Sequence, residues 1–221
     1  MRYTLNEHIY IANYHDTAVL LDTNQDRFHL LESVTAQEIN DVFCGKESEK
    51  INHLRQVLSN ANLIRNSTSD PPVIQSFESN CFFEQRGVNK QYGNKINYLV
   101  VALAAFFILC SYAGIKLLGY RVINKLPGSR STRSPKCELA KAKMLSDHTK
   151  LAFVLLGEPG KCLVEAIALY LILSLWGCTA VLCVGVRTRP LLSHAWVEVQ
   201  NKVLNDDDNL RTKLAIILEK S

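Results

Sequence analysis

The sequence predicts an α+β protein that is built from two domains with different tasks. Its 221 residues are 48% hydrophobic and 21% charged, which is the composition of a folded chain and not of a disordered one. Residues 1–85 hold 12 acidic and 6 basic side chains, whereas residues 86–221 hold 9 acidic and 19 basic ones. Between these parts, residues 67–72 (STSDPP) have the composition of a linker.

The predicted domains are therefore residues 1–66 and 93–221, joined by a linker over residues 67–92. The net charge of +4 is too small for a general nucleic-acid coat, so no nucleic-acid partner is expected. The seven cysteines are scattered and form no Cys-x-x-Cys pair, which predicts neither a disulfide framework nor a metal site. Residues 1–16 lack a basic start followed by an apolar run, so a cytoplasmic protein without a signal peptide is expected.

The first domain is predicted to contain three short strands followed by helices. Alternating or continuous apolar runs place the strands at residues 8–13, 17–22 and 27–31. Thr35 and Glu38 have the spacing of a capping box, which predicts that a helix starts there. A second helix is expected over residues 48–60, where apolar side chains recur three and four residues apart.

The C-terminal region is predicted to form a helix, three strands and a last helix. The first helix covers residues 161–175, and Gly177 suits the position after its C-terminal end. The other elements are expected at residues 179–186, 194–199, 203–205 and 210–219.

Three residues of this region fit a thiol nucleophile with its base. Cys162 stands where the helix begins, and the free N–H groups of a helix start favour a thiolate. His194 lies on one strand and Asp206 at the end of its hairpin partner, so antiparallel pairing brings them side by side. Alone, each residue has an ordinary structural explanation. Asp207 is an alternative to Asp206, because three aspartates follow one another.

These residues resemble a known family. Residues 192–199 (LSHAWVEV) and 203–206 (VLND) look like the signature of the lasso-peptide maturation proteases. Residues 161–163 (KCL) also fit this family, and residues 183–190 (CVGVRTRP) and 209–214 (NLRTKL) are similar to its microcin-type branch.

The resemblance is specific over about residues 150–221. Residues 1–65 look like the PqqD-type recognition fold, a winged-helix-type domain, by topology alone. One departure is the pair Gln200-Asn201, where the family has a glycine in the hairpin turn. Because asparagine also adopts positive φ, the fold is still expected.

The resemblance implies a leader-recognition domain followed by a transglutaminase-like (papain-like) cysteine protease domain. Its catalytic triad would be Cys162, His194 and Asp206. The implied reaction is cleavage between the leader and the core of a lasso precursor peptide. An asparagine-synthetase-like cyclase would be the partner that closes the ring with ATP, and this chain would bind no cofactor itself.

The third strand of the first domain is expected to be an edge to which an extended leader can add. Leader side chains would then lie in a groove between this strand and the second helix. The candidate leader-binding residues are Phe28, Leu30, Leu54, Val57 and Leu58. The alternative is that these five residues simply form the core of the domain, in which case they should be fully buried.

Residues 96–115 are uncharged over 20 positions, which is the length of a membrane span. A span would put the recognition domain and the protease on opposite faces of a membrane, where one precursor could not meet both. A core helix is therefore favoured, and membrane contact stays open.

Two other functions compete with the leader peptidase: a transglutaminase-type acyl transferase, and a non-catalytic adaptor that binds precursor peptides. The acyl-enzyme chemistry of peptidase and transferase is shared, and only the acceptor differs. The cluster Ser146, Asp147 and His148 suggests a serine hydrolase. Because neighbouring helical residues point in different directions, this cluster is not expected to be a site.

Overall fold

The computed structural model describes the chain except for residues 1, 71, 80–95, 129–138 and 158–161. Its contacts divide the chain into two compact units. The first unit comprises Met1–Cys81, Val186–Leu192 and Leu214–Leu218, and the second comprises Phe82–Gly185, Ser193–Lys213 and Glu219–Ser221. Most of the expected linker lies outside the described residues, but its described part contains the short strand β6 (Ser76–Phe77).

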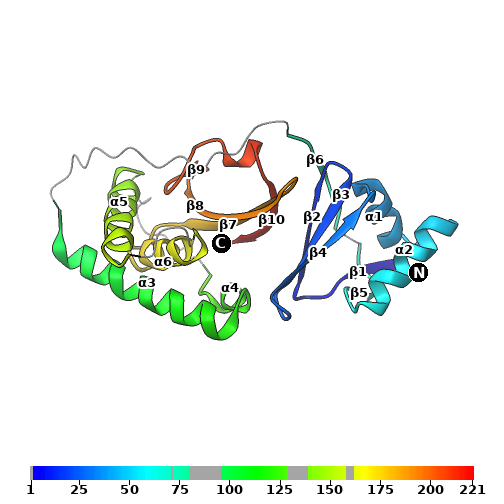
Figure 1. Ribbon diagram of the computed structural model, residues 1–221, viewed down its shortest axis with the longest axis horizontal. Helices are drawn as coiled ribbons and strands as arrows, with labels where there is room; N and C mark the ends of the chain where they lie inside the picture. Colours follow the sequence, from blue (N-terminus) through cyan, green and yellow to red (C-terminus); the bar gives the residue numbers. More distant parts are fainter. Residues whose placement is uncertain (1, 71, 80–95, 129–138, 158–161) are drawn as a thin grey trace. The chain divides into compact units, whose positions relative to one another are not determined.

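The first unit contains a four-stranded sheet in the order β4-β3-β2-β6 and a separate antiparallel pair, β1 with β5 (Figure 1). Its further strands are β1 (Arg2–Leu5), β2 (Ile9–Tyr14), β3 (Thr17–Asp22), β4 (Arg27–Glu32) and β5 (Ile64–Ser67). The three predicted strands are confirmed as β2, β3 and β4, which pair antiparallel in chain order. The sequence reading missed β1, β5 and β6.

Helices α1 (Ala36–Phe43) and α2 (Glu49–Asn60) supply the rest of the first unit. The capping box is confirmed: the Thr35 hydroxyl accepts a hydrogen bond from the Glu38 N–H, and the Glu38 carboxylate accepts one from the Thr35 N–H. The apolar faces of both helices share one core with the sheet, and this core includes Leu20, Phe43 and Leu54.

Among its described residues the second unit contains four helices, and a second sheet has the order β10-β7-β8-β9 (Figure 1). The helices are α3 (Tyr98–Leu118), α4 (Arg121–Lys125), α5 (Leu139–Leu155) and α6 (Cys162–Leu175). The strands are β7 (Ala180–Thr188), β8 (Leu191–Val199), β9 (Lys202–Val203) and β10 (Ala215–Lys220).

Helix α6 is the centre of the second unit and packs against α3 and α5. It is apolar nearly all round, which is the pattern of a helix enclosed on every side. Its residues from Ala166 to Tyr170 are buried without a break. The helix ends as the sequence predicts, with Gly177 at a φ of 72°.

The predicted last helix over residues 210–219 is wrong. Only Leu210–Thr212 form a single 3-10 turn, and the chain then runs as strand β10 beside β7. A short apolar run satisfies helix and strand patterns alike, so the unpaired edge of β7 decides the outcome.

The expectation of a core helix over residues 96–115 is also corrected. In the described part of the chain, α3 is the one helix long and apolar enough to cross a membrane, and only 22% of its most apolar window is buried.

Cys178 differs from expectation as well, since it is disulfide-bonded and not a free thiol.

Candidate active site

Cys162 is the first residue of α6, as the sequence predicts. Its sulfur accepts hydrogen bonds from the His194 side chain and from the backbone of Ala195 and Leu163. Burial raises the pKa of this thiol, but these hydrogen bonds and the charge of the imidazole outweigh burial and lower it below the ordinary value. The site therefore favours a thiolate.

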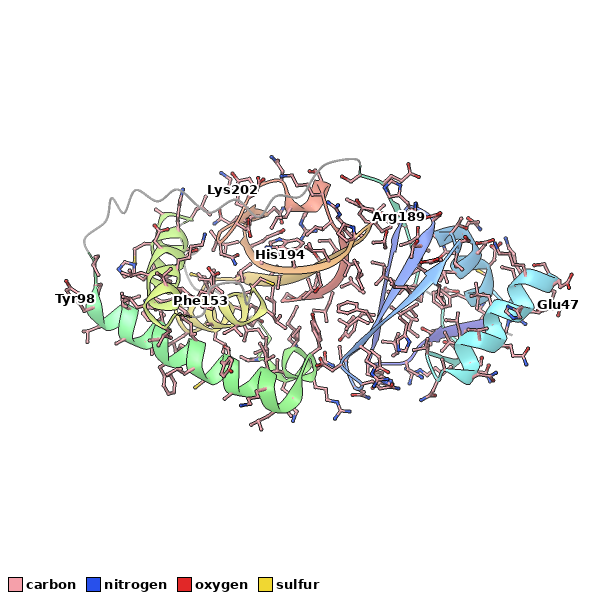
Figure 2. The ribbon with its side chains drawn as sticks, viewed as in Figure 1. Glu47, Tyr98, Phe153, Arg189, His194 and Lys202 are labelled. Atoms are coloured by element: carbon pink, nitrogen blue, oxygen red, sulfur yellow. The ribbon has the colours of Figure 1, made fainter. Side chains whose placement is uncertain are left out.

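His194 lies on β8 and is 5% exposed (Figure 2). Its Nε2 is 2.7 Å from Oδ2 of Asp206. Burial of the ring lowers the pKa of His194, but hydrogen bonds to Asp206 and Cys162 more than compensate and raise it to about 9. Burial likewise raises the pKa of Asp206, and the bond to His194 brings it below its usual value. The three groups thus form one chain of charge-assisted hydrogen bonds.

The hairpin of β8 and β9 brings His194 and Asp206 together. The Leu204 N–H donates to the Val197 carbonyl, and the Val197 N–H donates to the side chain of Asn205 at 2.9 Å. A side chain thus replaces the backbone partner at this point, and the chain leaves the ladder just before Asp206.

The ambiguity among the three aspartates has a geometric answer. Asp206 bonds His194, whereas the Asp207 carboxylate accepts a hydrogen bond from Lys213 Nζ at 2.6 Å. The Asp207 N–H also donates to Asp206 Oδ1, which holds that carboxylate in place. The side chain beside the imidazole is that of Asp206.

A second polar network, which the sequence reading missed, lies beneath the imidazole. The rings of His194 and Trp196 are stacked, with their centroids 6.3 Å apart, because residues two apart on a strand share a face. The Trp196 Nε1–H donates to Glu198 Oε1 at 2.7 Å, and the Arg211 Nε–H donates to both carboxylate oxygens of Glu198 at 2.9 and 3.0 Å. The alternation His-x-Trp-x-Glu was the signal that could have predicted it.

The cluster of Ser146, Asp147 and His148 is not a serine-hydrolase site. The Ser146 hydroxyl donates to the Leu204 carbonyl, and His148 donates from Nδ1 to the Met144 carbonyl. His148 Nε2 accepts from the Asn97 N–H, which starts α3. These residues join α5 to its neighbours. Among the described residues, no group of three His, Cys, Asp or Glu side chains could hold a metal.

The five candidate leader-binding residues do not line one groove. Leu54 and Leu58 are 6% and 1% exposed and belong to the core, while Leu30 and Val57 are both 41% exposed. The core contains Ala18 and Leu20, which pair with Leu31 and His29, so Phe28 and Leu30 point to the opposite face of the sheet. The expected groove is therefore wrong, although β4 is the sheet edge that the sequence predicts.

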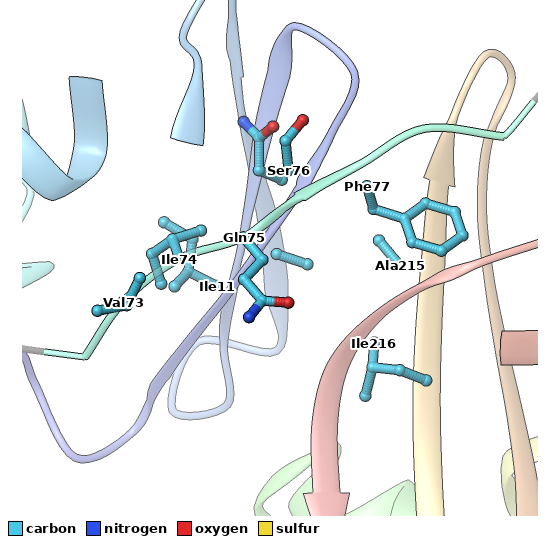
Figure 3. A pocket seen from close by; sticks show the side chains of 10 residues that line it. Ile11, Val73, Ile74, Gln75, Ser76, Phe77, Ala215 and Ile216 are labelled. Carbon is cyan, nitrogen blue, oxygen red and sulfur yellow. The ribbon is translucent and has the colours of Figure 1, made fainter. Parts of the chain in front are cut away.

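A pocket of about 340 Å³ lies at the other edge of the same sheet (Figure 3). It is lined by residues 11–13 of β2, residues 73–77 around β6, and Ala215 and Ile216, all of which belong to the first unit. Because β6 and β4 are opposite edges of the sheet, this pocket is separate from the expected leader-binding edge.

The family model of the transglutaminase-like superfamily matches residues 99–219, which is more than half of the chain. The chain belongs to the transglutaminase-like superfamily. The matched range contains Cys162, His194 and Asp206. It also contains α3, α4, α5 and α6, except for the first residue of α3.

The transglutaminase-like chain is also similar to the Microcin J25-processing protein McjB of Escherichia coli. The two sequences are 48% identical over 58 residues, which are 26% of this chain and 28% of that protein. The similarity thus spans less than a third of the relative's length. No solved structure matches the chain.

Proposed function

We propose that this protein is a cysteine endopeptidase that cleaves the leader from the core of a lasso-type precursor peptide. The observation that carries the proposal is the hydrogen-bonded arrangement of Cys162, His194 and Asp206 at the start of α6. The similarity to a protein that processes microcin J25 supports the substrate class.

In the proposed reaction, the Cys162 thiolate attacks the scissile carbonyl and His194 gives its proton to the departing amine. This step breaks the amide bond and leaves the leader as a thioester on Cys162. His194, now neutral, then takes a proton from water, whose oxygen attacks the thioester and releases the leader as a carboxylic acid. Asp206 holds the imidazole in position throughout.

The first unit would bind the leader. Strand β4 is an open edge of its sheet, so an extended peptide can add there through main-chain hydrogen bonds. The exposed Leu30 on β4 would contact side chains of the leader. The released core would then pass to an asparagine-synthetase-like cyclase that uses ATP.

Mass spectrometry of a precursor peptide after incubation with the full chain tests this function. Two fragments whose masses sum to that of the precursor plus one water support hydrolysis. An unchanged precursor that stays bound would instead indicate an adaptor.

A transglutaminase is the second candidate, since the matching superfamily is named for that activity. The same thioester would then form from a glutamine side chain and react with an amine. The mass spectrum of the uncleaved peptide should then show a loss of ammonia, so the same experiment distinguishes a transglutaminase from a peptidase.

A further inference from the structure

We infer that the outer face of α3 is a docking surface for an anionic phospholipid bilayer. This face presents apolar side chains that recur three or four residues apart along the helix. They are Leu99, Ala102, Phe106, Leu109, Ala113 and Leu117. Figure 2 shows a row of side chains on the side of α3 that faces away from α5 and α6.

The large side chains of this stripe are strongly exposed and lie on one face of the helix. Leu99 and Leu117 are 83% and 81% exposed, and Phe106 and Leu109 are 58% and 56% exposed. At a rise of about 1.5 Å per residue, the stripe is about 27 Å long. A continuous apolar surface of this kind indicates a partner that covers it.

The charges around the stripe select a lipid surface as that partner. Residues 97–125 contain no acidic side chain, whereas Lys116 and Lys125 are both exposed. Lys116 adjoins the stripe beside Leu117, so its long stem can follow the apolar face while its ammonium group reaches a phosphate. Tyr98, 78% exposed at the other end, has the amphipathic ring that favours the headgroup layer.

The helix would lie in the plane of the membrane surface and not across it. Its inner side packs against α5 and α6 and buries Val100, Ala104 and Ile108. A spanning orientation would require this buried face to leave its neighbours. The outer stripe alone is free to enter the boundary between headgroups and acyl chains.

Co-sedimentation of the full chain with vesicles tests this inference. We expect binding to vesicles of phosphatidylglycerol and phosphatidylethanolamine, and binding at least about tenfold weaker to phosphatidylcholine, because each basic residue near the surface adds to the attraction. The double variant Phe106→Glu/Leu109→Glu should bind at least about tenfold more weakly than the wild type. Lys116→Glu/Lys125→Glu should remove the preference for anionic vesicles.

Val57→Glu is the matched control, since it places the same charge on an exposed apolar site of α2 in the first unit, and it should bind as the wild type does. Circular dichroism establishes that each variant is folded, and Phe106→Ser with Leu109→Ser replaces the double variant if it is not. The inference is overturned if the wild type does not bind anionic vesicles or if the stripe variants bind equally well. Resistance to carbonate extraction would also overturn it, because that behaviour indicates a spanning helix.

Discussion

The thiol of Cys162 differs from the other described thiols in its neighbours. His194 and two backbone groups bond its sulfur, whereas burial and the nearby carboxylate of Glu198 raise the pKa of Cys183 well above the usual range. Cys162→Ala should therefore abolish cleavage and leave precursor binding intact. Cys183→Ala is the control, and it should lower the free energy of unfolding but keep activity.

Peptide mapping after alkylation gives an independent measurement of this difference. At neutral pH iodoacetamide should label Cys162 and the exposed Cys44 and Cys110, but not Cys183. Cleavage by a Cys162→Ala enzyme would contradict the proposed nucleophile.

The coupled charges of Cys162 and His194 predict a bell-shaped pH dependence of kcat/KM. Because the pKa of His194 is raised to about 9, its proton is available to the leaving amine below that pH and is lost above it. Because the pKa of Cys162 is lowered, the thiolate persists below the pH at which an ordinary thiol is protonated, and activity falls only at lower pH.

His194→Ala should slow alkylation of Cys162 at pH 7 by about tenfold or more, since each unit of pKa changes the thiolate fraction tenfold. An unchanged alkylation rate would show that His194 does not activate the sulfur.

Asp206 and Asp207 should respond differently to the same substitution. Asp206→Ala removes the acceptor at 2.7 Å from His194 and should lower kcat by about 10²-fold or more, but less than His194→Ala. Asp207→Ala removes only the bond to Lys213 and should keep most of the activity. Equal losses in both variants would mean that the turn as a whole, and not one carboxylate, is required.

At the scale of elements, β8 is held in place by hydrogen bonds on the face that carries His194. There the Glu198 carboxylate accepts from Trp196 and from Arg211. Glu198→Leu would leave the indole N–H of Trp196 and the guanidinium of Arg211 without this acceptor. Since Arg211 is half-exposed and can be hydrated, we expect a loss of about 2 kcal/mol in the free energy of unfolding. Glu219→Gln, which touches the same arginine at the exposed surface, should cost less than about 1 kcal/mol. Equal losses by chemical denaturation would contradict the buried anchor.

Leader recognition can be tested by substitutions on β4, whereas substitutions in the core of the domain would unfold it. Leu54→Asp would bury a charge in the core and unfold the first unit, at a cost of about 3–5 kcal/mol. Leu30→Asp changes an exposed side chain on the open edge and should weaken precursor binding while the fold is kept. Val57→Asp, equally exposed but on α2, is the control for binding measured by calorimetry. The recognition role of β4 fails if Leu30→Asp binds as tightly as this control.

Local signals in the sequence predicted most of the elements that hold the candidate site. The start of α6 at Cys162, the glycine that ends it, and the capping box at Thr35 all depend on neighbouring residues. The wrong predictions concern segments whose structure or burial depends on residues that are distant in the sequence. Strand β10 exists because β7 has an open edge, and α3 keeps an exposed side because α5 and α6 pack against its other side.

The same reasoning explains the candidate leader site. Alternation along β4 places Phe28 and Leu30 on one face, as the sequence predicts, but no local pattern tells which face meets the helices. The partners of His29 and Leu31 on β3 decide this, and they lie in the core.

At the scale of the whole molecule, two units on one chain predict a division between binding and chemistry. A precursor shortened to the last few leader residues before the cleavage site would lose the contacts with the first unit but keep those with the second. Its kcat/KM should fall by about 100-fold or more, because the leader no longer raises the local concentration of the scissile bond. The kcat at saturation should change little, which steady-state kinetics on both peptides can measure. A large fall in kcat would instead mean that the leader reshapes the active site.

Because the hairpin between β8 and β9 is short, the distance from His194 to Asp206 depends on the number of residues in it. Its turn residues Gln200 and Asn201 both have positive φ, at 53° and 59°, and the strands pair Glu198 with Val203. Adding the same even number of residues to both strands would keep His194 on its face of β8 and keep the pairing of the strands, since side chains alternate with a period of two. Adding a single residue to one strand would turn the carboxylate away from the imidazole. The number of residues between His194 and Asp206 therefore decides whether the two side chains lie close together, and we expect an insertion in one strand alone to break their hydrogen bond.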